Sequence, residues 1–159
     1  MMQTLLVRTL ASHDAAALRA MLGMFGTAFG DPATYTTKQP DDAYLKQLLA
    51  SDTFVAIAAF AGQSVVGGLA GYTLPKFEQP RTELYIYDLA VDEAYRRRGV
   101  ATSMIEELQK VATARGAYVI FVQADPGDDA AVALYAKLGV REEVLHFDIS
   151  PVAMTRPPA

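Results

Sequence analysis

Three consecutive arginines followed by a glycine and small residues form a segment that could bind phosphate. The run is Arg96-Arg97-Arg98-Gly99-Val100-Ala101, between a predicted strand and a predicted helix. A helix N-terminus offers unpaired N–H groups and partial positive charge, which together suit a pyrophosphate. Gly99 lets the backbone approach such a ligand, small Ala101 avoids a clash in the first helical turn, and the arginines add cationic charge. The alternative is an ordinary basic loop before a helix, because a six-residue pattern of this kind arises often by chance. The pattern matches neither the dinucleotide fingerprint nor a Walker P-loop, which disfavours dinucleotides and nucleotide triphosphates as ligands.

Asp88 is the only carboxylate inside the apolar run LYIYDLAV. A charge within a central strand costs free energy unless it is paired or points into a cleft. We therefore predict that Asp88 contacts a substrate amine and helps to remove its proton. A structural carboxylate bonded to backbone or to an arginine is the alternative.

The composition limits the class of protein. A chain of 159 residues with 52% hydrophobic residues suits one globular domain, and the absence of cysteine excludes disulfides, thiolate nucleophiles and cysteine metal sites. The net charge of -4 argues against nucleic-acid binding and fits a cationic substrate, although such a charge also simply aids solubility. No segment approaches the roughly 20 apolar residues of a membrane span, and Arg8 interrupts any signal-peptide core. We expect a cytoplasmic protein without metal.

Hydrophobic periodicity and turn residues predict the elements that position these side chains. Strands are predicted at 3–9, 53–61, 64–74, 83–91, 117–124 and, as one or two strands, 140–149. Helices are predicted at 14–25, 42–50, 100–115 and 130–138, with Gly26 and Gly30 breaking the first and a polar loop at 30–40.

Alternation of helices and strands in the second half places strands 83–91 and 117–124 near each other and parallel, whereas the first half is antiparallel. The strand at 117–124 has no polar alternation, which is typical of an interior strand covered on both faces. These features predict the α/β class: a central mixed sheet flanked by helices on both faces, in one domain over 1–150 with a tail at 151–159.

Two segments resemble the motifs of the GNAT superfamily of acetyltransferases. DLAVDEAYRRRGVATSMI is similar to its motif A, whose pattern is Q/R-x-x-G-x-G/A, and YVIFVQAD followed by AVALYAKLGV is similar to its motif B. More narrowly, FGDPATY, LPKFEQPR, ELYIYDLAV, AYVIFVQADPGDD, AVALYAKLG and REEVLHFDI resemble type I aminoglycoside 3-N-acetyltransferases. This likeness runs from about Leu22 to Ile149.

The resemblance implies an acetyl-CoA-dependent N-acetyltransferase that confers resistance to gentamicin-type aminoglycosides and forms a homodimer. It implies that the backbone of Leu89, Ala90 and Val91 binds the pantetheine arm and that residues 97–102, including Thr102, bind the pyrophosphate. Transfer by direct attack on the thioester is the simpler route, since no residue has the context of a covalent nucleophile. Tyr135 would then protonate the leaving thiolate; packing on the sheet is its alternative role.

A polycationic acceptor requires several carboxylates. Candidate residues for the acceptor at the predicted edge of the sheet are Glu83, Asp125, Asp128, Asp129, Glu142 and Glu143. Each could instead be a solvated charge or, for Asp128 and Asp129, a helix cap. Asp31 and Tyr35, in the loop between the first helices, are expected to close the site from the other side. A pair of His146 with Asp148 is expected on the surface. Two other functions stay open: acetylation of a polyamine or another small cationic amine, and non-catalytic binding of acyl-CoA.

Overall fold

The computed structural model describes residues 3–153, and the chain forms two compact units that divide between Gln123 and Ala124. The first unit holds one sheet of five strands in the order β1-β2-β3-β4-β5 within the described residues. Their bounds are β1 Leu5–Thr9, β2 Phe54–Ala61, β3 Ser64–Pro75, β4 Thr82–Val91 and β5 Ala117–Val122. The helices of this unit are α1 Ala15–Ala28, α2 Pro32–Tyr35, α3 Asp42–Ala50 and α4 Val100–Ala114, with 3-10 turns at Ser12–Asp14 and Glu93–Tyr95.

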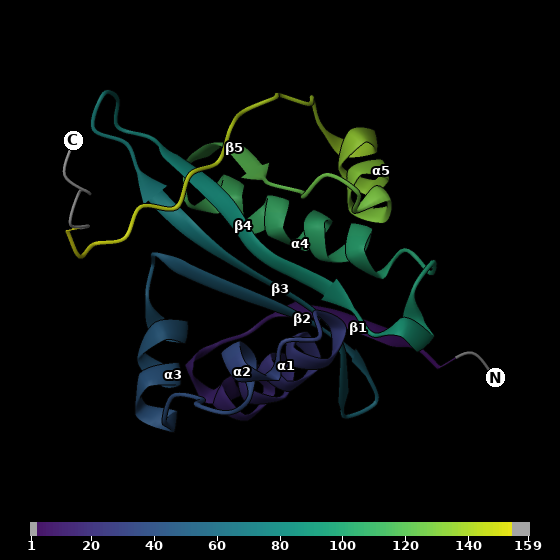
Figure 1. Cartoon of the computed structure of the whole chain (residues 1–159). Helices are drawn as coiled ribbons and strands as arrows, with labels where there is room; N and C mark the ends of the chain where they lie inside the picture. The colour runs from purple at the N-terminus through teal and green to yellow at the C-terminus, as the bar shows by residue number, and fades with distance from the viewer. Residues whose placement is uncertain (1–2, 154–159) are drawn as a thin grey trace. The chain divides into compact units, whose positions relative to one another are not determined.

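The sheet is mixed, as predicted. Strands β1 to β4 pair antiparallel, through the hairpin at Gly62-Gln63 and the longer turn before β4. Strand β5 pairs parallel to β4, because α4 carries the chain back across the sheet. This crossover places the residues that follow β4 at the start of α4, on one side of the molecule (Figure 1).

Helices cover both faces of this sheet, as the surroundings of two neighbouring glycines of β3 demonstrate. A Cβ on Gly68 would meet Met21 and Phe25 of α1, whereas one on Gly67 would meet Val100 and Met104 of α4. Since successive strand residues point to opposite faces, α1 and α4 lie on opposite sides. Figure 1 shows α1, α2 and α3 below the sheet and α4 above it.

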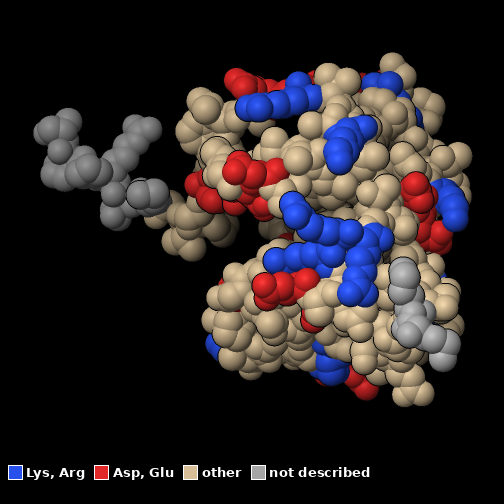
Figure 2. Space-filling view, turned by 90° about the vertical axis from the view of Figure 1, so that its right-hand side faces the viewer, with Lys and Arg blue, Asp and Glu red and all other residues tan. Residues whose placement is uncertain are grey.

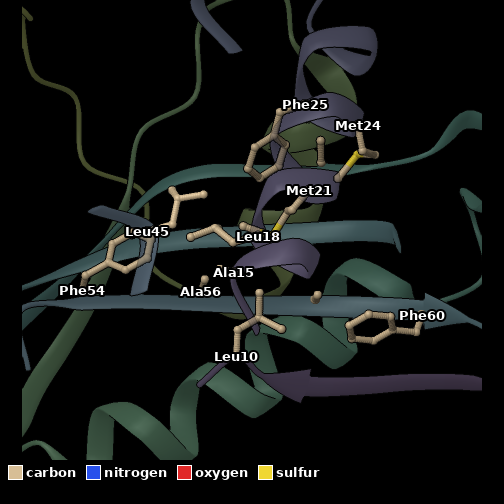
Figure 3. Close-up of a cluster of buried hydrophobic side chains, with 12 residues drawn as sticks. Leu10, Ala15, Leu18, Met21, Met24, Phe25, Leu45, Phe54, Ala56 and Phe60 are labelled. Carbon is tan, nitrogen blue, oxygen red and sulfur yellow. The ribbon is translucent and has the colours of Figure 1, made fainter. Parts of the chain in front are cut away.

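A cluster of buried apolar side chains joins α1 and α3 to the lower face of the sheet (Figure 3). Phe25 and Met21 of α1 and Leu45 of α3 are almost fully buried there, against Phe54 and Ala56 of β2. Burying such side chains contributes roughly 1.5–3 kcal/mol each, so this packing fixes where α1 and the chain after it lie over the sheet.

The first helix is longer than predicted, and the prediction that Gly26 breaks it was wrong. Gly26 lies inside α1, and a Cβ there would come within 2.9 Å of the Thr36 side chain. The glycine therefore permits close packing of the following segment, and the helix ends before Gly30, whose φ is +62°. The predicted loop at 30–40 also contains the single-turn helix α2, begun by Pro32 and by the side chain of Asp31.

The second unit contains α5, Asp129–Leu138, where the sequence predicts a helix capped by Asp128 or Asp129; the cap is Asp128. The predicted strands at 140–149 were wrong: the described chain forms no strand there. Alternating apolar residues favour a strand, but a strand also needs a partner for its backbone hydrogen bonds. For the same reason β5 is an edge strand within the described sheet, not the interior strand predicted, and Tyr118 and Val119 are exposed.

None of the helices described in residues 3–153 is long and apolar enough to cross a bilayer. The prediction of a single domain over 1–150 stays a prediction.

Candidate active site

The basic loop after β4 has an unusual backbone. Asp92 begins it by accepting a hydrogen bond from the N–H of Ala94 at 2.9 Å. Arg97 has a φ of +61° and Gly99 a φ of +76°, so the chain turns twice through the left-handed region before α4. The Arg96 side chain donates to the carbonyl oxygen of Val91 at 3.0 Å, which ties the loop to the end of β4. Arg96 therefore has a structural contact that the sequence did not predict.

The N-terminus of α4 leaves donors free for a ligand. Gly99 is its N-cap, and the helical ladder begins where Ser103 N donates to the Gly99 carbonyl at 3.0 Å. The N–H groups of the first turn, which include Ala101 and Thr102, have no partner inside the helix. A Cβ on Gly99 would find no heavy atom of the described chain within 4 Å, so open space lies above this turn.

Cationic side chains surround this turn. Arg96, Arg97 and Arg98 are all exposed, and the Arg98 guanidinium lies 5.2 Å from the ring centroid of Tyr95. Figure 2 views the molecule from the side on which β4 ends, and Lys and Arg side chains gather across the middle of this face. Free N–H groups, a positive helix end and arginines together fit a pyrophosphate such as that of coenzyme A.

The last part of β4 has one free edge within the described sheet. Its pairing with β5 ends at Ile86 and Val122, whereas its pairing with β3 continues to Val91. A register shift skips Tyr87, which bulges between Ile86 and Asp88. Beyond the last pair with β5, the backbone of Leu89, Ala90 and Val91 is therefore open on that edge of β4. An extended chain, such as a pantetheine arm, could pair there as a short added strand.

Asp88 follows this bulge and is half-buried. Its Oδ1 accepts a hydrogen bond of 2.9 Å from the hydroxyl of Tyr35, 53 positions earlier in the chain. Burial raises the pKa of the Asp88 carboxyl, and the hydrogen bond from Tyr35 acts in the opposite direction. A raised pKa makes the Asp88 carboxylate a better acceptor for the proton of an amine than an ordinary aspartate.

Tyrosines that the sequence analysis did not select surround Asp88. Tyr72 of β3 and Tyr87 of β4 meet edge to face with ring centroids 5.8 Å apart, and both are exposed. Tyr85 contacts Tyr87 at 5.5 Å and stacks on Phe121 at 4.6 Å. The run YIY at 85–87 indicates only a strand in the sequence. That these rings converge depends on the register between β3, β4 and β5.

The acceptor residues predicted in the first unit have different surroundings. Tyr35 contacts Asp88 directly, whereas Asp31 accepts from Thr34 N at 3.1 Å and so caps α2. Glu83 lies five residues before Asp88 on the same strand, accepts the hydroxyl hydrogen of Tyr118 and lies 3.6 Å from Lys76. The Tyr118 hydrogen bond, and then Lys76, hold the pKa of the Glu83 carboxyl below its usual value. Asp31 and Glu83 thus already have partners within the protein.

The remaining predicted residues lie in the second unit. Tyr135 is half-buried on α5, and its carbonyl accepts from Gly139 N at 2.9 Å. Asp128 caps this helix by accepting from Ala131 N at 3.1 Å. His146 and Asp148 form the expected surface pair at 3.0 Å. The other acidic residues predicted for the acceptor are exposed: Asp125, Asp129, Glu142 and Glu143.

Comparisons with known proteins agree with the binding geometry described above. Residues 19–140 match the acetyltransferase (GNAT) family. An aminoglycoside acetyltransferase from an uncultured soil metagenomic sample is 56% identical, with a TM-score of 0.91 over 94% of this chain and 99% of that one. A second such enzyme, also from soil and solved in complex with sisomicin, is 30% identical, with a TM-score of 0.83 over 92% of this chain and 95% of that one.

Among curated proteins, the ribosomal protein bS18-alanine N-acetyltransferase of Salmonella typhimurium is 30% identical over 71 residues, which are 45% of this chain. The match spans about half of that relative's length, 48%. The family match covers both the β4 strand end and the α4 loop described above. The chain belongs to the GNAT acetyltransferase family.

Proposed function

We propose that this protein transfers the acetyl group of acetyl-CoA to the 3-amine of the 2-deoxystreptamine ring in gentamicin-type aminoglycosides. One observation carries the proposal: a single segment, residues 88–102, joins a half-buried carboxylate to an open helix N-terminus surrounded by arginines. The first group suits an amine and the second a pyrophosphate. The likeness to two aminoglycoside acetyltransferases, one of them bound to sisomicin, supports the choice of acceptor.

The chemistry proposed is direct transfer. The amine nitrogen attacks the thioester carbonyl, so that a C–N bond forms and the C–S bond breaks. Asp88 takes the proton that leaves the amine, and the Tyr135 hydroxyl gives a proton to the departing thiolate. The residues proposed to bind the cosubstrate are Leu89, Ala90, Val91 and Arg96 to Thr102.

The acceptor would be held by charge and by ring contacts. Aminoglycosides carry several ammonium groups, and cations attract both carboxylates and the faces of tyrosine rings. The exposed rings of Tyr72 and Tyr87 adjoin Asp88 and offer such a face. We also propose a homodimer, because exposed apolar side chains such as Leu145, Phe147 and Ile149 are typical of interaction surfaces.

The decisive measurement is thiol release from acetyl-CoA with a panel of amines: gentamicin, spermidine and a peptide with an N-terminal alanine. We expect turnover of gentamicin, with NMR placing the acetyl group on the 3-nitrogen. Acetylation at the 6′-nitrogen would contradict the regiochemistry, and turnover of spermidine or the peptide alone would contradict the acceptor. Release of no thiol with any amine would favour a binding protein.

Asp88→Asn serves as the matched variant, since it keeps the shape of the side chain and removes its charge. It should depress kcat/KM for the drug and leave coenzyme A affinity nearly intact. Expressed in a susceptible bacterium, the wild-type chain should raise the inhibitory concentration of gentamicin, and Asp88→Asn should not. The KM for the drug should rise with salt, because ion pairs are screened over about 10 Å at 0.1 M.

A further inference from the structure

The hydrogen bond between Tyr35 and Asp88 connects two parts of the molecule that are far apart in sequence. Tyr35 ends α2 and Asp88 lies in β4, and the hydroxyl donates to Oδ1 at 2.9 Å. Burial and the adjacent Asp88 raise the pKa of the Tyr35 hydroxyl well above its usual value, so it remains a donor throughout the physiological range.

The Tyr35 ring is held on several sides. The ring of Tyr35 meets that of Phe25 edge to face, with ring centroids 5.8 Å apart, and lies 5.5 Å from the ring centroid of Phe29. Its carbonyl accepts from the Gln39 side chain at 3.2 Å, and Gln39 in turn accepts from Arg19 at 3.0 Å. Since Phe25 belongs to the buried core, the hydroxyl has little freedom to leave Asp88.

The two carboxylate oxygens of Asp88 are not equivalent. Oδ1 accepts from Tyr35, while Oδ2 has no side-chain hydrogen bond to any residue in 3–153. We propose that Tyr35 is a positioning residue, which fixes the Asp88 carboxylate so that Oδ2 faces the acceptor amine. This inference rests on the proposed function, and it changes the role of Tyr35 from an acceptor contact to a partner of Asp88.

The groups around Asp88 make this role measurable through pH. Those that face it are phenols: Tyr35 from α2, Tyr72 from β3, and Tyr85 and Tyr87 from β4; Asp31 lies beyond Tyr35. From α1 the neighbouring side chains are apolar. Phenols ordinarily titrate near pH 10, so among the groups that face Asp88 only its own carboxyl contributes to the acid limb of a kcat/KM profile. The amines of the drug contribute to the same limb but titrate identically with every variant, so a difference between variants reports on Asp88.

Tyr35→Phe removes the hydroxyl and keeps the ring that packs on Phe25. We expect a fall of about 10-fold in kcat/KM for gentamicin, the loss expected for one hydrogen bond to a charged group. The acid limb should move to higher pH, because the hydrogen bond that favours the charged carboxylate is gone. KM for acetyl-CoA should not change. An acid limb at the wild-type position would overturn the proposal.

Tyr85→Phe is the matched control, because its hydroxyl also donates to a side chain, Gln123 at 2.9 Å, but not to Asp88. Its acid limb should stay where the wild type has it. In an Asp88→Asn background, Tyr35→Phe should have little further effect on kcat/KM. An undiminished 10-fold loss in that background would show that Tyr35 acts independently of Asp88, and so would refute the inference.

A carbon-13 NMR titration of the Asp88 carboxyl in the free protein separates this inference from the proposed function. It requires no acceptor. If gentamicin is not acetylated, the proposed function fails, yet an upward shift of the Asp88 pKa in Tyr35→Phe still supports the coupling. If gentamicin is acetylated and that pKa does not move, the function stands and the positioning role is refuted.

Discussion

Gly99→Val tests the phosphate loop most directly. Gly99 has a φ of +76°, and a side chain there would point into open space above the first turn of α4. In the proposed site, the pyrophosphate would lie in that space to reach the free N–H groups. The substitution therefore has two separable effects: strain in the backbone and obstruction of the ligand.

Each effect has an expected cost in free energy. An L residue in the left-handed region costs about 1–2 kcal/mol or, when β-branched, somewhat more. For a chain of this length that is a fall of roughly 2–8 °C in Tm. Displacing the phosphate from one N–H group loses a hydrogen bond to a charged acceptor, about 1.5–3 kcal/mol. Coenzyme A affinity should then fall by roughly 10- to 150-fold.

Gly116 provides the matched control at the other end of α4. Its φ is +72°, and a Cβ there also meets nothing within 4 Å. Gly116→Val should therefore lose similar stability by calorimetry while its Kd for coenzyme A, measured by titration calorimetry, stays near the wild-type value. Equal affinity in Gly99→Val and Gly116→Val would refute the assignment of pyrophosphate binding to the first turn of α4. If either valine variant fails to fold, the alanine pair makes the same comparison.

Three further predictions concern the leaving group, the acceptor and stability. Tyr135→Phe should lower kcat by about 10²-fold with little change in KM for acetyl-CoA, and a wild-type kcat would assign Tyr135 to packing. Tyr87→Ser should raise the gentamicin KM by roughly 2- to 5-fold through loss of a cation–ring contact, and steady-state kinetics with an unchanged KM would exclude that contact. Asp14 accepts two hydrogen bonds from Arg8, both at 2.8 Å, and chiefly for that reason its pKa falls to about 2. Because the folded pKa lies below the usual 3.8, this carboxylate stabilises the fold fully above about pH 5, and the stabilisation is lost as pH falls toward 2. Urea unfolding from pH 6 to 2 should show a shallower loss in Asp14→Asn, and identical pH slopes would contradict the assignment.

The sequence by itself determined the elements whose signals are local. The apolar run around Asp88 predicts β4, and the period of Met104, Ile105 and Leu108 predicts α4, because these patterns arise from side chains a few positions apart. The loop between them therefore had to place Arg96 to Gly99 at a helix N-terminus. In this way the sequence alone predicted a helix N-terminus beside three arginines and an isolated carboxylate on β4.

Only the tertiary structure decided what surrounds that carboxylate. Tyr35 and Asp88 are 53 positions apart, and they meet because the core under α1 fixes α2 over β4. Tyr72 and Tyr87 converge through strand register and the bulge at Tyr87, which no local pattern specifies. The wrong predictions have the same origin. Gly26 packs against Thr36, and the strands expected at 140–149 lack a partner among the described residues. In both cases the outcome depends on a contact with a separate segment of the chain.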